Sequence, residues 1–185
     1  MYASIDQCTS GFPDVSPNEN LNGQGDNTKV TTQLFPDLRF GCNGTIVRMV
    51  VAVANKRGQH SPKIQVWRED KAQTGIYHRQ GAEIQIIDDN PACIRDRRSH
   101  DVFRCTLNEM YYISVQPGDI LGLELPPRKD VDFDIYFTPG GPTSYIFEGK
   151  LNCTINISEA ANKSNYLPQI SLVVILGMIH DQPIS

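Results

Sequence analysis

Short apolar runs, each ended by proline, glycine or asparagine, recur about every ten residues along most of this 185-residue chain, as in all-β domains. Residues 131–137 alternate strictly between apolar and polar side chains, which is the period of a strand with one buried face. No stretch of ten residues keeps an apolar pattern at helical spacing for long. The sequence therefore predicts an all-β protein with little helix.

Roughly ten such strands predict two antiparallel sheets packed as a β-sandwich, for which we prefer a jelly-roll-like connectivity. Residues 45–54 are too continuously apolar for a strand with one solvent-exposed face, so we expect them in the middle of a sheet or crossing a sandwich. Residues 101–107 and 110–115 are predicted to form a hairpin. Residues 131–137 and 166–176 are each predicted to form one strand.

An immunoglobulin-like sandwich is the alternative fold. Cys42, Trp67 and Cys105 follow the Cys, Trp, Cys order of that family, and Phe103 precedes the second cysteine where a tyrosine is typical. However, 25 residues separate Trp67 from Cys42, a longer interval than that fold uses. The jelly-roll-like arrangement therefore remains the preferred prediction.

The length fits one domain with a loose N-terminal segment. Residues 1–28 are rich in Asn, Gly, Ser, Asp and Pro and lack periodicity, so we expect an extended arm there. Residues 29–185 are expected to form a single β-sandwich domain. A net charge of −4 argues against a nucleic-acid partner, because such binding needs a dominant basic surface.

Four N-x-[ST] glycosylation sequons indicate the secretory pathway. They begin at Asn43, Asn152, Asn156 and Asn162, three of them within eleven residues. Twelve asparagines in a chain of this Ser and Thr content would give roughly one or two sequons by chance. The excess predicts a glycoprotein, with coincidence in an Asn-rich loop as the alternative.

Five cysteines agree with an oxidising compartment, in which they can form disulfides. A zinc site is not indicated, because no C-x-x-C or Cys/His spacing of such a site is present. Cys93 and Cys105 flank a polar loop and are predicted to form one disulfide. Cys8 lies in the N-terminal arm, and a bridge to Cys42 would attach that arm to the domain. Cys153 is then left over, although five cysteines leave many pairings open.

These signals place the protein outside the cell or on its surface. Met1 opens directly onto polar sequence, so we expect a fragment that lacks its signal peptide. Residues 170–179 are apolar over only about half the length that a bilayer requires, so a membrane tether is expected only outside this sequence.

Several segments in a fixed order resemble a poorly characterised ectodomain module, repeated in predicted multidomain cell-surface proteins of sponges and similar simple animals. The segments are residues 34–46, 64–68, 117–122, 141–145 and 167–172, and the resemblance covers residues 34–175. Met49 stands where the module often has tryptophan. The resemblance implies adhesion or recognition outside the cell, with an unknown extracellular protein or glycan as partner. It brings no catalytic or ligand residues with it.

The sequence offers no catalytic motif. The four histidines are not paired at metal-ligand spacing, and no G-x-S-x-G elbow or phosphate-binding glycine loop occurs. We therefore predict a non-catalytic recognition or adhesion module without a cofactor or metal. The alternative is a secreted carbohydrate-binding or carbohydrate-active jelly roll, which as a glycosidase would need two facing carboxylates in a cleft.

Arg95, Arg97 and Arg98 form the one local basic cluster, in the loop that the Cys93–Cys105 bridge would constrain. A constrained basic loop could contact sulfated glycans or an acidic protein face. A solvated loop kept soluble by its charge is the alternative. These arginines are the candidate partner-binding residues.

Overall fold

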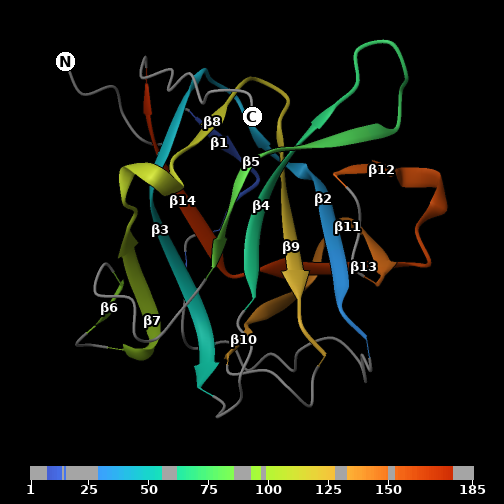
Figure 1. The fold of residues 1–185 in the computed structure, drawn as a ribbon. Coiled ribbons are helices and arrows are strands. Elements are labelled where there is room, and N and C mark those ends of the chain that lie inside the picture. The colour runs from blue at the N-terminus through green and yellow to red at the C-terminus, as the bar shows by residue number, and fades with distance from the viewer. Residues whose placement is uncertain are drawn as a thin grey trace.

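In the computed structural model the chain forms two antiparallel β-sheets packed against each other (Figure 1). The structure describes residues 8–13, 15, 29–55, 62–85, 93–96, 99–127, 133–149 and 153–176. Within these residues the only helical segments are two 3-10 turns, η2 (Glu109–Tyr111) and η4 (Ile157–Glu159). The prediction of an all-β, jelly-roll-like sandwich is confirmed.

The larger sheet has eight strands. Their order across the sheet is β12 (Thr154–Asn156), β5 (Ile76–Gln85), β4 (Lys63–Glu69), β9 (Ile120–Leu125), β2 (Thr31–Phe40), β11 (Phe137–Glu148) and β13 (Asn162–Pro168), and β1 (Thr9–Ser10) pairs with β2. Part of the predicted N-terminal arm thus adds a short strand to this sheet, with Thr9 opposite Phe40.

The smaller sheet has six strands and is built around β3 (Gly44–Asn55). One edge of β3 carries β10 (Phe133–Ile135) and β14 (Ile170–Leu176), and the other carries β7 (Ser99–Thr106) and β8 (Ile113–Val115). Strand β6 (Cys93–Asp96) pairs with β7 at the border of the sheet. The central position predicted for the apolar run 45–54 is therefore correct.

Two separate groups of buried side chains hold the fold together. The main core lies between the sheets and combines residues such as Phe35 and Leu121 of the larger sheet with Met49 and Phe103 of the smaller one. The second core lies on the opposite face of the larger sheet and consists of Leu34, Trp67, Tyr77, Ile120, Phe147 and Ile155. The larger sheet is thus buried on both faces.

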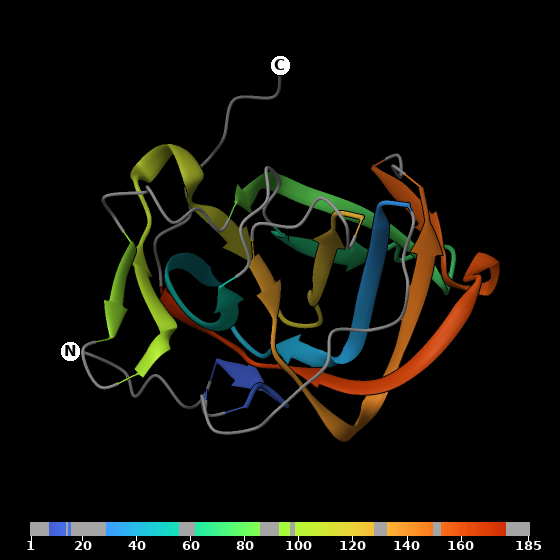
Figure 2. The same ribbon diagram turned by 90° about the horizontal axis from the view of Figure 1, so that it is seen from below.

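The larger sheet buries its second face by curling on itself. β12 and β13 stand at opposite ends of the strand order, yet only residues 157–161 separate them in the chain. In that connection the Ile157 N–H donates to the Gly75 carbonyl (2.8 Å) and the Ala161 N–H to the Ile146 carbonyl (2.9 Å). The two edges are therefore brought together, and Figure 2 shows the larger sheet bent into a curve.

Two strand connections cross between the sheets at one corner. β10 leads into β11 through Tyr136, and β13 leads into β14 through Gln169. The Gln169 N–H donates to the Tyr136 carbonyl (2.8 Å), and the carbonyl of Gln169 accepts from the Ala52 N–H (2.9 Å). The predicted single strands 131–137 and 166–176 are each divided by this crossing. On one side of the corner β10 and β14 pair with β3, and on the other side β11 and β13 pair with each other in the larger sheet.

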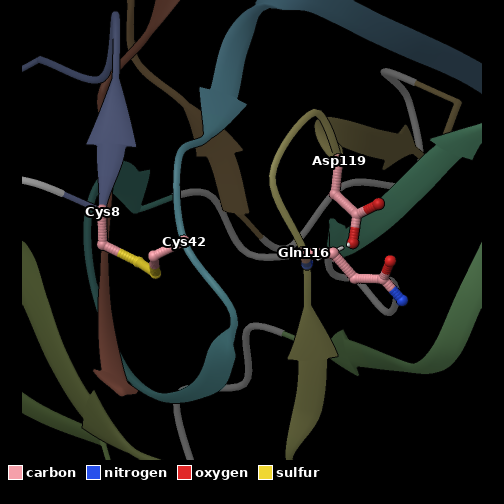
Figure 3. The surroundings of a disulfide bond; sticks show 4 residues. All are labelled: Cys8, Cys42, Gln116 and Asp119. Atoms are coloured by element: carbon pink, nitrogen blue, oxygen red, sulfur yellow. Dashed lines mark hydrogen bonds between the residues drawn. A yellow bond between two sulfur atoms is a disulfide. The ribbon is translucent and has the colours of Figure 1, made fainter. Parts of the chain in front are cut away.

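A second corner joins β2 to β3 and β8 to β9. The Cys8–Cys42 disulfide lies beside the first connection, and the Gln116–Asp119 turn forms the second (Figure 3). Asp119 is 1% exposed and accepts hydrogen bonds from the Gln116 N–H (2.9 Å) and from two guanidinium nitrogens of Arg68 (2.7 and 2.8 Å). A buried carboxylate needs such partners, so the turn before β9 is tied to β4.

The predicted hairpin between residues 101 and 115 is wrong. β7 and β8 both pair with β3, at residues 48–52 and 44–46, and so follow one another along the same edge. The residues between them form η2, with Met110 64% exposed. The alternating pattern of each strand is visible in the sequence. However, the turn of a hairpin and a turn between two consecutive strands on the same edge have similar compositions, so the sequence did not distinguish them.

The immunoglobulin-like alternative is also wrong. Cys42 bonds to Cys8, and Cys105 bonds to Cys93, so no disulfide joins Cys42 to Cys105. Trp67 belongs to the second core on the other face of the larger sheet and does not pack in the main core between the sheets. The order of the three residues in the sequence is a coincidence.

Trp67 packs directly over Gly122 of the neighbouring strand β9. A Cβ atom at position 122 would lie 2.5 Å from both Cδ1 and Nε1 of the indole and 3.1 Å from Cδ2 of Leu34. Trp67 is 1% exposed, so the ring is packed against other side chains of the second core. Glycine at 122 is therefore required by the packing of the second core.

We expect Gly122→Ala to lower the free energy of unfolding by roughly 1–3 kcal/mol through overpacking, measured by urea denaturation. In a Trp67→Leu background the same change should cost clearly less, because the clashing indole is gone. An equal cost in both backgrounds would show that the contact with Trp67 is not the cause.

Candidate functional site

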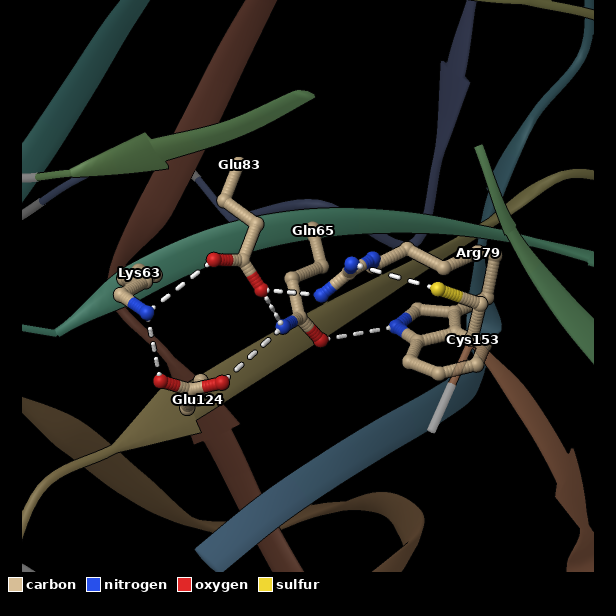
Figure 4. A network of polar contacts seen from close by, with 7 residues as sticks. Lys63, Gln65, Arg79, Glu83, Glu124 and Cys153 are labelled. Carbon is tan, nitrogen blue, oxygen red and sulfur yellow. Dashed lines mark hydrogen bonds and ion pairs between the residues drawn. The ribbon is translucent and has the colours of Figure 1, made fainter. Parts of the chain in front are cut away.

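Charged and amide side chains gather on the face of the larger sheet that carries the second core (Figure 4). We call Lys63, Gln65, Arg79, Glu83 and Glu124 the polar cluster; β4 supplies the first two, β5 the next two and β9 the last. Because side chains alternate along a strand, Lys63 and Gln65 share a face with Trp67. β4 lies between β5 and β9, which brings the five side chains together.

Lys63 and Gln65 each link the two carboxylates of the cluster. The Lys63 ammonium lies 3.0 Å from Glu83 Oε2 and 2.8 Å from Glu124 Oε1. The Gln65 amide nitrogen donates to Glu83 Oε1 (2.6 Å) and to Glu124 Oε2 (3.5 Å). The cluster thereby connects all three strands across their outer face.

The orientation of Gln65 is set by the indole below it. Trp67 Nε1 donates to Gln65 Oε1 (3.0 Å), so the amide nitrogen must point toward the two carboxylates. Gln65 is only 2% exposed, and a buried amide with these three contacts has little freedom to turn. The polar cluster is therefore anchored to the second core through this one hydrogen bond.

The pKa shifts in the cluster favour the charged forms. Burial alone would raise the pKa of Glu83, but hydrogen bonds from Lys63 and Gln65 and the nearby charge of Arg79 outweigh it and lower that pKa. Burial would likewise lower the pKa of Lys63, yet Glu124 and Glu83 raise it. At neutral pH Glu83 is thus an anion and Lys63 a cation.

This arrangement differs from the carboxylate pair of a glycosidase. Such a pair needs a protonated acid with a raised pKa beside a second carboxylate. Here an ammonium lies within hydrogen-bonding distance of both carboxylates, and the pKa of Glu83 is lowered. The one tryptophan is buried and cannot serve as a sugar platform. The geometry is that of an ion-paired brace between strands.

Arg79 connects the cluster to the unpaired cysteine. Its guanidinium donates to Glu83 and, through Nη2, to Cys153 Sγ at 3.4 Å. The backbone N–H of Arg79 also donates to the backbone carbonyl of Cys153 (2.8 Å). This bond holds the chain before β12 against β5. Cys153 is exposed and is the one cysteine without a disulfide, as predicted.

The predicted disulfides are both present. Cys8 and Cys42 close 34 residues of chain, and Cys93 and Cys105 close 12. In the chain-entropy model loops of these sizes contribute about 4 and about 3 kcal/mol. Cys93 lies directly opposite Cys105 in the β6–β7 ladder, so the second bridge fixes that hairpin.

The described sequons lie at the surface. Asn43 and Asn162 are exposed, in the β2–β3 connection and at the start of β13. Asn156 is half-buried, and its Oδ1 accepts hydrogen bonds from the N–H (3.0 Å) and hydroxyl (2.7 Å) of Ser158 in the same sequon. Asn152 lies outside the described residues. Whether any of them carries a glycan stays a prediction.

The predicted basic loop falls largely outside the described residues. Arg97 and Arg98 are not described, and only the backbone of Arg95 is, in β6. Sequence reasoning missed the polar cluster, although strand alternation along residues 63–68 puts Trp67 on the face opposite Ile64 and Val66. The same alternation assigns Lys63 and Gln65 to the face of Trp67, and this was the available signal.

Comparison with known proteins gives no further assignment: no family model matches the chain, and no curated protein matches it significantly. Among the residues that the structure describes, no helix is long and apolar enough to span a bilayer. In the same residues, no three His, Cys, Asp or Glu side chains gather as a metal-binding group.

The ion pairs of the polar cluster predict a pH-dependent contribution to stability. A carboxyl group with a lowered pKa stabilises the fold above its unfolded value, near 4.5, and loses that contribution as the pH falls through its lower folded value. We expect Glu83→Gln to lower the free energy of unfolding at pH 7 by about 1–2 kcal/mol. The difference from the unmodified protein should shrink as the pH falls below about 4.5 and disappear only below the lowered folded pKa of Glu83.

Glu148→Gln is the matched control, because Glu148 pairs with Lys29 at 3.2 Å on the open surface, where such pairs contribute little. Denaturant titrations at several pH values would provide the comparison. A Glu83→Gln effect that is the same at pH 3.5 and pH 7 would contradict the ion-pair explanation.

Proposed function

We propose that this chain is a non-catalytic recognition or adhesion module of a secreted or cell-surface glycoprotein. One observation carries the proposal: the same small domain combines two disulfides with sequon asparagines exposed on its surface. Disulfides persist in oxidising compartments, and N-glycans are added in the secretory pathway. Both features therefore point to the same location.

The scaffold is better suited to presenting a binding surface than to catalysing a reaction. The strands are rigidly held by two cores, and the polar cluster has its hydrogen-bonding groups engaged by one another. Rigid sheets with exposed loops are a common basis for binding. The carbohydrate-active alternative is less well supported, because the paired carboxylates are neutralised by Lys63.

The ectodomain resemblance of residues 34–175 supports the same proposal, since it implies adhesion or recognition. The segments that carry it include the β2–β3 corner and the turn before β9, two places where the chain crosses between sheets. The proposed partner is an extracellular protein or glycan.

Glycans would restrict where the partner binds. Asn156 and Asn162 lie on β12 and β13 of the larger sheet, and Asn152 precedes β12 in the sequence. Glycans at these positions would cover that side of the molecule. We therefore expect the binding face elsewhere, and an interface centred on Asn156 in the glycosylated protein would contradict this.

The compartment is tested by non-reducing peptide mapping of protein secreted from animal cells behind an added signal peptide. We expect intact Cys8–Cys42 and Cys93–Cys105 bridges, with glycans on Asn43 and Asn162 because their side chains are exposed. Protein with reduced cysteines and bare sequons would overturn the extracellular assignment.

The recognition role is tested with the secreted, glycosylated domain displayed on a multivalent carrier, because many weak contacts then add up. We expect saturable binding to animal cell surfaces or their extracellular matrix, measured by flow cytometry. A carrier bearing a reduced and alkylated sample of the same protein is the control. Equal binding by both carriers, or by neither, would reject a folded recognition module.

A further inference from the structure

One border strand of the smaller sheet leaves an apolar edge unpaired. β14 pairs with β3 along one edge, and no strand of the described part of the chain pairs with its other edge (Figure 1). An unpaired edge presents a row of backbone N–H and C=O groups to which another strand can be added. The seven residues of β14, ISLVVIL, include no charge, proline or glycine. β14 therefore lacks the residues that normally prevent such pairing.

The other border strands are better protected. In β13 the first four residues are polar and include Lys163, and a lysine on an edge strand opposes the addition of a further strand. β1, β6, β10 and β12 have only two to four residues each. The extra residue in the β14 ladder, Val47, belongs to β3 and leaves β14 regular. Among the border strands that the structure describes, β14 is thus the long apolar one.

The end of β14 also exposes apolar side chains. Ile170 and Leu172, in the first part of the strand, are buried in the main core. By contrast, Ile175 is 40% exposed and Leu176 is 45% exposed. Apolar surface and an unpaired backbone edge therefore occur together at this end of the strand.

A glycosylation sequon lies directly beside the exposed end. Strand register places Gly44 opposite Leu176, and Asn43 precedes Gly44. The two strands approach closely there, because a Cβ atom on Gly44 would lie 2.6 Å from the carbonyl oxygen of Ile175. Since consecutive Cα atoms are about 3.8 Å apart, the Cα atom of Asn43 is within roughly 8 Å of that oxygen. Asn43 is exposed, so a glycan on it would stand next to the end of β14.

The other described sequon asparagines belong to the larger sheet. Asn156 ends β12 and Asn162 begins β13, and neither strand pairs with a strand of the smaller sheet. Asn43 is therefore the described sequon asparagine that adjoins the end of β14. Asn162, which is also exposed, provides a matched control.

We propose that an N-glycan on Asn43 covers the end of β14 and prevents a second copy of the domain from pairing with this edge. The proposal rests on the glycoprotein assignment above and gives one of its glycans a specific role. A glycan is bulky and solubilising, so beside Ile175 and Leu176 it excludes an approaching strand. Without the glycan, two copies of β14 can pair antiparallel about a two-fold axis, because their uncharged sequences bring no like charges together.

The test compares the protein secreted from animal cells with its Asn43→Gln and Asn162→Gln variants by sedimentation velocity over a range of concentrations. We expect the unsubstituted protein and Asn162→Gln to be monomeric. Asn43→Gln should approach about twice the monomer mass as its concentration rises, because pairing of two identical edges closes a dimer. Addition of Ile175→Lys to Asn43→Gln should restore the monomer, since the lysine opposes edge pairing.

Mass spectrometry establishes which sequons carry glycans, and thermal unfolding shows whether each variant is folded; Leu176→Lys replaces Ile175→Lys if the latter does not fold. The proposal is wrong if Asn43→Gln stays monomeric, if Asn162→Gln or the unsubstituted protein associates equally, or if neither lysine reverses the association. A bare Asn43 beside an occupied Asn162 would also reject it, while leaving the extracellular assignment intact. Bare sequons throughout the secreted protein would reject both.

Discussion

The need of the larger sheet to bury both of its faces determines most of this structure. Leu34 and Phe35 are adjacent in β2, and both are fully buried, one in each core. A flat sheet in a two-layer sandwich would leave Leu34, Trp67 and Ile120 in water, at a cost of roughly 1.5–3 kcal/mol for each large side chain. Curling brings β11 and β12 over them. The 157–161 connection between the outermost strands is short because the curl has already brought those strands close.

The polar cluster is a consequence of the same curl. Lys63, Gln65 and Glu124 continue the face that Trp67 and Ile120 occupy, at the side where the second core ends. Partly buried charges need partners, and the side chains available on β4, β5 and β9 are one another. The result is an ion-paired brace that extends the apolar core toward solvent. For this reason the most organised polar site of the described structure is best explained by folding, and binding is more reasonably sought elsewhere.

The alternation of apolar and polar residues predicts which side chains of a strand face the core. It does not predict where the chain crosses between the sheets or which strands become neighbours. The inward side chains of β4 and β9 follow from their period of two, and the Pro117–Gly118 turn before β9 follows from its composition. Tyr136 and Gln169 could not be recognised as crossing points, since each continues the apolar alternation of its neighbours and only hydrogen bonds to β3 distinguish the two sides. The partners of Glu83 were equally hidden, because they depend on which strands become neighbours. Cysteine pairing was more accessible, since Cys93 and Cys105 flank one short hairpin.

Burial decides how much each ion pair of the larger sheet contributes to stability. Asp119 is 1% exposed, so removal of its partner Arg68 would leave a buried carboxylate without its counter-ion. Lys63 is partly buried and lies 2.8 Å from Glu124 of the neighbouring strand, so this pair joins β4 to β9. The pair of Lys29 with Glu148 lies on the open surface, where such pairs contribute little. The charges that hold this sheet together are therefore the ones that its own strands bury.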